Sequence, residues 1–122
     1  MNSVNDLKMP TEYRRFLNIL LTAMQGDDRI DQILLFGSCA KGSVHPNSDI
    51  DIAVITKVQL TMKEEMSFYD YLSHIAPKDY IPCDMLVMSR KQFDEHKESS
   101  FYVQKYIHAE GVELREPLRA GI

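Results

Sequence analysis

Apolar residues recur along the chain with two different periods, and each period predicts a different kind of element. Between Pro10 and Gly26 they return every three or four positions, which is the spacing of one face of an α-helix. Thr11 has the side chain of a helix N-cap, and Gly26 is typical of a helix end. The residues predicted to form the buried face of this helix are Tyr13, Phe16, Leu17, Leu20 and Met24.

The helical period returns in the second half of the chain. Thr61 and Glu64 form the capping box of a helix predicted over residues 61–76, with Met62, Met66, Tyr69, Leu72 and Ile75 on its inner face. Ser89 and Gln92 form a second capping box, which predicts a short polar helix. Ser99 is the predicted N-cap of a last helix, which carries Tyr102, Val103, Tyr106 and Ile107 on one side and ends at Gly111.

Short apolar runs bounded by turn residues predict the strands. They cover residues 30–36, 50–55 and 80–88, and residues 112–114 predict a short edge strand. This order of elements predicts an α/β or α+β fold in which helices pack on a small mixed sheet. We expect one domain over residues 11–116, with residues 1–10 and 117–122 as loose termini.

Composition and charge restrict the function classes. The chain has 122 residues, 44% of them hydrophobic, and a net charge of −4, which argues against an extended nucleic-acid surface. No apolar run is long enough to cross a membrane and no secretory signal is visible, so we expect a cytoplasmic protein. Cys39 and Cys83 fit no zinc-binding spacing, and we expect both to be reduced thiols.

Two aspartates open the strand predicted over residues 50–55. Asp49 and Asp51 are two positions apart, so a strand turns both side chains to the same face. Two carboxylates about 4 Å apart repel by roughly 4 kcal/mol at an effective dielectric of about 20, unless a cation or water screens them. An Asp-x-Asp pair is otherwise typical of a solvated strand edge, but Asp51 lies within a run that looks buried, where an unpaired charge is costly.

Two further features extend this pair to a candidate site. Gly37-Ser38 follows the first predicted strand, and the backbone and hydroxyl of such a turn suit a phosphate, although an ordinary turn has the same residues. Asp84 interrupts the apolar strand over residues 80–88 and needs a partner there, either a lysine, backbone N–H groups or a metal ion shared with Asp49 and Asp51. Three acids on one small sheet suit a two-metal site for phosphoryl transfer.

The residues of this stretch resemble a known signature. Gly37-Ser38, ten further residues and then Asp49-Ile50-Asp51 resemble the motif of the polymerase-beta-type nucleotidyltransferase superfamily. Residues 34–55, LLFGSCAKGSVHPNSDIDIAVI, are similar to the loop of the minimal nucleotidyltransferases, and Asp84 matches the third carboxylate of the superfamily. The resemblance spans most of residues 11–116. Cys39 departs from it, because relatives often carry an aromatic or apolar residue there.

The resemblance implies a role for each motif residue. Gly37 and Ser38 would hold the β- and γ-phosphates of a nucleoside triphosphate, and Lys41 would touch phosphate unless it is a solvated loop lysine. Asp49 and Asp51 would bind two Mg²⁺ ions. Asp84 would complete one metal site and help to deprotonate the attacking hydroxyl. ATP is the expected substrate and AMP the expected transferred group.

The resemblance also implies an acceptor. Minimal nucleotidyltransferases are commonly paired with a helical HEPN-type protein, so the first hypothesis is an antitoxin that transfers AMP to a tyrosine of such a partner. The second hypothesis is an antitoxin that acts by binding its partner, with little or no catalysis. The third is transfer to a small molecule of the aminoglycoside type, for which we identify no separate acceptor domain. A homo-oligomer is compatible with each of the three hypotheses.

Overall fold

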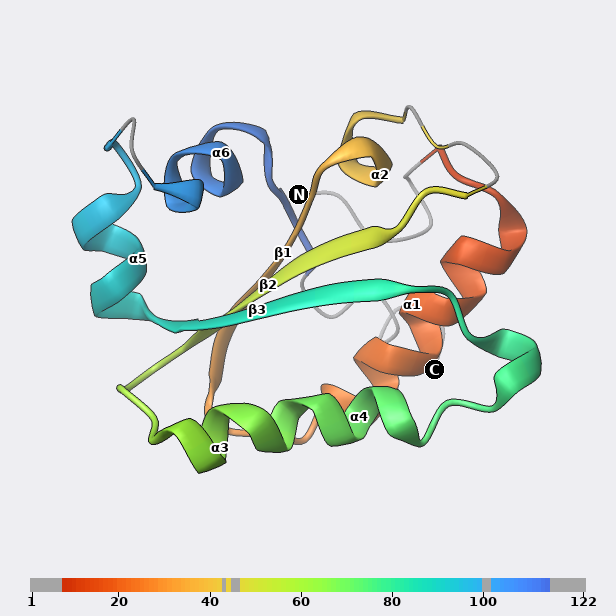
Figure 1. Ribbon diagram of the computed structural model, residues 1–122, viewed down its shortest axis with the longest axis horizontal. Coiled ribbons are helices and arrows are strands. Elements are labelled where there is room, and N and C mark those ends of the chain that lie inside the picture. The colour runs from red at the N-terminus through yellow and green to blue at the C-terminus, as the bar shows by residue number, and fades with distance from the viewer. Residues whose placement is uncertain (1–7, 43, 45–46, 100–101, 115–122) are drawn as a thin grey trace.

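A computed structural model describes residues 8–42, 44, 47–99 and 102–114 of the chain. Within these residues the structure contains short and long helices around one sheet (Figure 1). The elements, in order, are α1 (Thr11–Met24), β1 (Ile30–Phe36), α2 (Ser38–Lys41), β2 (Ile50–Thr56), α3 (Met62–Met66), the 3-10 helix η2 (Ser67–Tyr69), α4 (Asp70–Ser73), the 3-10 helix η3 (Pro77–Asp79), β3 (Cys83–Ser89), α5 (Arg90–His96), α6 (Val103–Glu110) and β4 (Val112–Glu113).

The strands form one mixed sheet in the order β3-β2-β1-β4. β1 is antiparallel to both β2 and β4, whereas β2 is parallel to β3. The parallel pair requires a long crossover, and residues 57–82 with α3, η2, α4 and η3 provide it. The α/β fold with a small mixed sheet is therefore confirmed, and β3 is an edge strand.

Helices cover the two faces of the sheet unequally (Figure 1). One core cluster joins α1 and the crossover to inward side chains of the sheet such as Ile50, Ile52 and Met85. A smaller cluster joins α5 and α6 to Ala53, Ile55 and other residues of the opposite face. Because successive side chains of a strand point to opposite faces, Asp51 shares the second face with Ala53 and Ile55.

Helix α1 has the buried face that its sequence predicts. Its five predicted inner residues are all buried, and Phe16, Leu17 and Leu20 have no exposed area. The predicted N-cap is wrong by one residue, because Pro10 occupies the cap position in an extended conformation and Thr11 is already helical. The Pro10 carbonyl accepts hydrogen bonds from the N–H groups of Tyr13 and Arg14. Proline suits this place, since a helix start does not need its missing N–H.

The helix predicted over residues 61–76 begins as expected but does not continue as one helix. The capping box of Thr61 and Glu64 is present, yet the segment changes to a 3-10 turn and back to an α-helix. This change of period rotates the faces. The first part of the predicted inner face is therefore wrong: Met62 is 78% and Met66 is 59% exposed, while Phe68 is completely buried. The second part is confirmed, because Ile75 is buried and Leu72 packs against the core.

The last helix also differs from its prediction. Tyr102 is its N-cap and Ser99 lies outside it, where the Ser99 carbonyl accepts a hydrogen bond from the Tyr102 N–H. Ile107 is buried as predicted, but Val103 and Tyr106 are exposed. The capping box of Ser89 and Gln92, the helix end at Gly111 and the short edge strand are confirmed.

A polar network fixes the turn between α1 and β1 against the crossover. The carboxylate of Asp27 accepts hydrogen bonds from Arg29 Nε at 2.9 Å and from the Tyr71 hydroxyl at 2.7 Å. The Arg29 guanidinium also donates to Ser67 Oγ and lies 4.2 Å from the ring centre of Phe68. Hydrogen bonds from Arg29 are the main reason that the pKa of Asp27 falls from 3.8 to about 2.

We expect this network to make the protein sensitive to acid. A carboxyl group whose pKa is lower in the folded state stabilises the protein above its unfolded pKa, and the contribution is lost as the pH falls through the folded pKa. The free energy of unfolding should therefore decrease by roughly 2 kcal/mol between about pH 4 and pH 2 through Asp27 alone. Urea unfolding at several pH values would measure it. Asp27→Asn should remove this part of the pH dependence, and the exposed Asp28→Asn should keep it; equal slopes in both variants would contradict the prediction.

Two expectations concern the ends and the environment of the chain. Among the residues that the structure describes, no helix is long and apolar enough to cross a membrane. The predicted loose termini fall mostly on residues 1–7 and 117–122, which lie outside the described residues. The single domain over residues 11–116 stays a prediction.

Candidate functional site

Two of the predicted acidic residues lie directly beside each other. Asp51 on β2 pairs with Asp84 on β3 in the parallel register, so both side chains belong to the same face of the sheet. This is the face that α5 and α6 cover near the other end of the strands, at Ile55 and Met88. The two carboxyl groups therefore stand at the uncovered end of that face.

The surroundings of Asp51 favour its protonated form. Burial is the largest reason that its pKa is raised, followed by the negative charges of Asp84 and Asp49 and by a hydrogen bond with Asp84. The negative charges of the adjacent carboxyl groups therefore disfavour each other, and a cation bound between them would relieve this repulsion.

Gly37 lies against Asp51. Its φ of +74° and ψ of −158° belong to a region that only glycine adopts readily. A Cβ added at Gly37 would overlap Oδ2 of Asp51. The glycine predicted from the motif is therefore needed for its conformation and for the close approach of the carboxyl group.

Backbone contacts hold the loop that leads into β2. The Tyr13 hydroxyl donates to the carbonyl of Ser48 at 2.7 Å, and the Cys39 thiol contacts the carbonyl of Asp49 at 3.6 Å. Asp49 itself is exposed and lies just before β2. α1 and α2 thus fix the backbone on which Asp49 enters the site.

Ser38 and Lys41 begin and end the short helix α2. Ser38 opens the helix directly after Gly37, as the sequence predicts. Lys41 instead forms an ion pair with Glu110 of α6 at 3.2 Å, and 54% of its side chain is exposed. A role of either residue in binding phosphate stays a prediction, and Lys41 would have to leave Glu110 to take it.

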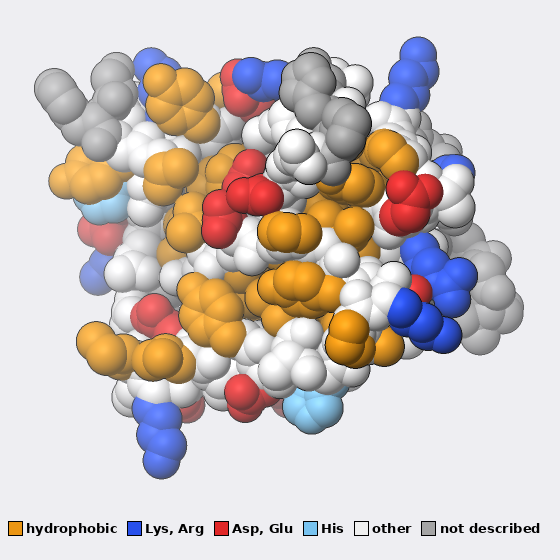
Figure 2. Space-filling view, turned by 45° about the vertical axis from the view of Figure 1, so that its right-hand side comes forward, with side chains coloured by type: hydrophobic (Ala, Val, Ile, Leu, Met, Phe, Trp, Pro, Cys, Tyr) orange, Lys and Arg blue, Asp and Glu red, His pale blue; other side chains and the backbone are white. Residues whose placement is uncertain are grey.

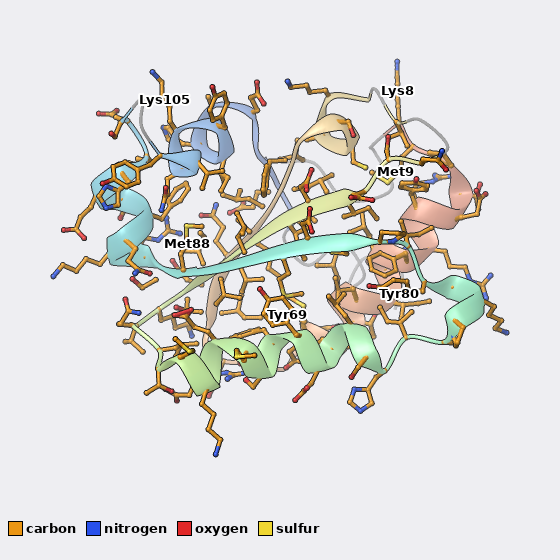
Figure 3. All side chains as sticks on the ribbon, in the orientation of Figure 1. Lys8, Met9, Tyr69, Tyr80, Met88 and Lys105 are labelled. Carbon is orange, nitrogen blue, oxygen red and sulfur yellow. The ribbon has the colours of Figure 1, made fainter. Side chains whose placement is uncertain are left out.

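A pocket of about 370 Å³ contains Asp51 and Asp84, and most of its other walls were not predicted. These walls include Phe36, Tyr69, Cys83 and Leu86. Phe36 and Cys83 directly precede the motif residues Gly37 and Asp84, and Leu86 lies two positions after Asp84. Their closeness to the motif in the sequence is a signal that could have identified them. Tyr69 carries no such signal: it comes from η2, and its hydroxyl donates to the carbonyl of Met85 at 2.8 Å (Figure 3).

The carboxyl pair fits a divalent cation in part. Mg²⁺ is usually held by one or two carboxylates together with substrate phosphates, and Asp51 and Asp84 supply that number of oxygen donors. Within the described residues, however, no group of three or more His, Cys, Asp or Glu side chains is close enough to hold a metal ion. The charge of Asp49 contributes to the raised pKa of Asp51, but Asp49 does not form a group of three with Asp51 and Asp84 that is close enough to hold a metal ion. The predicted triad is thus present as an adjacent pair with Asp49 near it.

Both cysteines lie close to this pair and are free thiols. The pKa of Cys39 rises to about 11 and that of Cys83 to about 12, mainly through burial and in part through the charges of the nearby aspartates. Thiols with such pKa values stay protonated at neutral pH and are poor nucleophiles. The chemistry of the site therefore belongs to its carboxyl groups.

Comparisons with known proteins agree with this geometry. The family model described as "Polymerase beta, Nucleotidyltransferase" matches residues 18–98, about two thirds of the chain. A protein of Methanocaldococcus jannaschii named "Putative protein adenylyltransferase MJ0141" is 33% identical over 51 residues, which are 42% of this chain and 52% of that protein. The chain thus spans about half the length of this relative.

Solved structures share the fold. A crystal structure of a toxin-antitoxin with AMP-PNP has a TM-score of 0.53 and 23% identity, covering 85% of this chain and 72% of that one. A crystal structure of a mutant of the toxin-antitoxin MntA-HpeT has a TM-score of 0.53 and 22% identity, covering 87% of this chain and 72% of that one. At this level of identity the likeness concerns the fold alone.

Proposed function

Because the chain belongs to the polymerase-beta nucleotidyltransferase family, we propose that this enzyme transfers AMP from ATP to a hydroxyl group of a partner protein. The observation that carries the proposal is the adjacent pair of carboxyl groups, Asp51 and Asp84, at the open end of the sheet beside Gly37. Two adjacent carboxyl groups whose charges disfavour each other are suited to receive a cation. The family motif and the donor chemistry both favour Mg²⁺ for this place.

The proposed reaction exchanges one bond to phosphorus for another. The acceptor oxygen forms a bond to the α-phosphorus of ATP, the bond from that phosphorus to the β-phosphate bridging oxygen breaks, and pyrophosphate leaves. The acceptor proton passes to Asp84, which is the more exposed carboxylate of the pair and has the hydrogen-bond capacity to accept it. Asp51 is held by burial and by Gly37, so it keeps its position while Asp84 handles the proton.

Other residues position the nucleotide in this proposal. Gly37 and Ser38 contact the β- and γ-phosphates, with the N–H groups that open α2. Asp49, Asp51 and Asp84 would hold Mg²⁺, which would draw charge from the α-phosphate and stabilise the leaving pyrophosphate. Lys41 adds a positive charge at the same end of the sheet once it separates from Glu110.

The names of similar proteins support a protein acceptor. One curated relative is named as a protein adenylyltransferase, and two solved structures with this fold are toxin-antitoxin complexes, one of them with the ATP analogue AMP-PNP. We therefore propose an antitoxin whose acceptor is a tyrosine of a helical HEPN-type toxin. Gene pairing makes the product of the adjacent gene the first acceptor to test.

Labelled ATP tests the proposal directly. The purified protein, Mg²⁺, ATP labelled at the α-phosphate and the product of the adjacent gene should give a labelled partner, and mass spectrometry should locate AMP on a tyrosine. Removing Mg²⁺ with a chelator or changing Asp49→Ala should abolish the label. A partner that stays unlabelled by the intact enzyme would refute the proposed acceptor, and label on an aminoglycoside instead would favour the small-molecule alternative.

A second function, in which the protein neutralises a toxin partner by binding alone, is supported by one observation. Exposed apolar side chains surround the acidic site on the face shown in Figure 2, and such a surface favours contact with another protein. The two functions differ in their need for the carboxyl pair. A partner that is still neutralised by Asp84→Asn would identify binding as sufficient.

A further inference from the structure

A groove crosses the outer edge of β3 next to the carboxyl pair. One wall consists of Met62, Met66 and Tyr69, from α3 and η2, and the other includes Val103 and Gln104 of α6. Its floor is β3 itself, from Leu86 to Met88, and its volume is about 390 Å³. The groove therefore links the helices on the two faces of the sheet across an edge that no strand of the described chain covers.

The groove is continuous with the acidic pocket. Tyr69 and Leu86 line both, so the two hollows adjoin at these side chains, and an occupant of the groove lies next to the pocket of Asp51 and Asp84. Figure 3 shows Tyr69 between the helical crossover and β3, and this side chain lines both hollows. A chain lying in the groove would have its next residue directed at the proposed site of transfer.

The walls are unusually apolar for an exposed surface. Met62 is 78%, Met66 59%, Tyr69 44% and Val103 42% exposed. Large exposed apolar surfaces of this kind mark places where another molecule binds. Methionine side chains are flexible and polarisable, and they adapt to the shape of a bound peptide. These are also the side chains that the helical period wrongly placed in the core.

The floor of the groove offers backbone hydrogen bonds. The carbonyls of Pro82 and Met88 face β2, since they accept from Ile50 N at 2.9 Å and from Thr56 Oγ1 at 3.5 Å. Backbone groups alternate along a strand, so the groups of Cys83, Met85 and Val87 face outward. Tyr69 occupies the Met85 carbonyl. The outward groups of Val87 remain available to an extended segment, as in β-strand addition.

Gln104 adds a second polar contact on the opposite wall. Its side-chain oxygen is buried and has no hydrogen-bond partner within the described chain. A buried acceptor without a donor is costly, and the backbone N–H of a bound segment would supply that donor. The groove thus has polar groups on its floor and its wall, with apolar side chains around them.

Charge limits what can bind. Apart from the thiol of Cys83 and the hydroxyl of Tyr69, the ionisable side chains that line the groove and the acidic pocket are the carboxyl groups of Glu65, Asp51 and Asp84. No lysine or arginine lines either of them among the described residues. An acidic segment would be repelled, whereas a basic one would be attracted.

We propose that this groove binds an extended, apolar and basic segment of the acceptor protein, which pairs with the edge of β3 at Val87 and brings its hydroxyl group to Asp84. The proposal rests on the proposed function, because it assigns the acceptor side of the same reaction. It explains how a small domain selects a protein acceptor: the nucleotide and the acceptor use different surfaces that meet at the carboxyl pair.

Kinetics with the product of the adjacent gene as acceptor test this assignment. Met66→Lys should raise the KM for the acceptor at least 10-fold and leave the KM for ATP unchanged, because the new charge repels a basic segment. Met66→Glu should have a smaller effect or lower that KM. Val58 is 64% exposed and does not line the groove, so Val58→Lys is the matched control and should behave as wild type. An unchanged KM for the acceptor in Met66→Lys would refute the groove as the acceptor-binding site and would leave the proposed function intact.

Photocrosslinking separates docking from transfer. A benzophenone amino acid at position 66 should crosslink the acceptor within a few residues of the labelled hydroxyl, and one at position 58 should not. The same crosslink should form in the Asp84→Asn background, which cannot transfer AMP. A crosslink without label in the active enzyme would refute the proposed function but keep the docking groove; absence of the crosslink would refute the groove whether or not label is transferred.

Discussion

Asp51→Asn is expected to reduce AMP transfer roughly 10³-fold or more and to leave the metal-free protein at least as stable as the wild type. Activity should fall because Asn keeps the shape of the side chain but removes the negative charge that holds a cation. Stability should not fall because the charge of Asp51 is unfavourable in the folded state: burial and the charges of Asp84 and Asp49 raise its pKa. At neutral pH a raised carboxyl pKa means that ionisation costs folding free energy, and Asn removes that cost.

Thermal unfolding with and without Mg²⁺ checks both halves of this prediction. Without metal, the melting temperature of Asp51→Asn should equal or exceed that of the wild type. With Mg²⁺, the wild type should gain stability and the variant should not, because ligands stabilise only the state that binds them. Asp28→Asn changes the net charge by the same amount at an exposed position outside the site and serves as the control. A clear loss of metal-free stability, or transfer at more than a tenth of the wild-type rate, would contradict the prediction.

Gly37→Ala is expected to have the second-largest effect, on stability and activity together. The conformation at Gly37 is one that residues with a Cβ adopt only at a cost of about 1–3 kcal/mol. The new methyl group would also overlap the carboxyl group of Asp51, which has to move. We therefore expect a loss of about 3 kcal/mol in the free energy of unfolding and a loss of transfer similar to that of Asp51→Asn.

Substitutions of two other glycines distinguish backbone strain from overlap with Asp51 as causes of this loss. Gly42 has a φ of +75°, but no atom of the described residues lies closer than 4.0 Å to an added Cβ, so Gly42→Ala carries backbone strain of about 1 kcal/mol without overlap. Gly26 has no positive φ and open space, so Gly26→Ala should be nearly neutral. Chemical unfolding should rank the three losses as Gly37, Gly42, Gly26. Equal losses at Gly37 and Gly42 would show that the contact with Asp51 is unimportant.

The fold could be predicted from local sequence patterns where burial follows a simple period. The inner face of α1, the three main strands and both capping boxes appear in the sequence because each depends on residues close together in the chain. The order of these elements then predicted a mixed sheet. Asp51 and Asp84 show what local patterns cannot predict, which is the contact between residues far apart in the chain. The motif predicts both acids, but only the parallel pairing of β2 with β3 places one directly beside the other.

The crossover shows why the rest could not be predicted. Met62 and Phe68 are both apolar and both fit a helix, and the period alone placed Met62 inside. The 3-10 turn at Ser67–Tyr69 and the contact of Arg29 with the Phe68 ring decide otherwise. These are tertiary effects, and they leave the methionines exposed in the groove. The same 3-10 turn places Tyr69 in the wall of the acidic pocket.

The parallel register of β2 and β3 has a consequence for how the enzyme becomes active during folding. A slip of β3 by one residue would turn Asp84 to the face that α1 covers and bring Cys83 or Met85 opposite Asp51. Parallel pairs across a long connection form slowly, because the chain between them must first be ordered. The carboxyl pair is therefore completed only when the crossover has docked, and incompletely folded chains carry the signature Gly-Ser and Asp-x-Asp segments without catalytic activity.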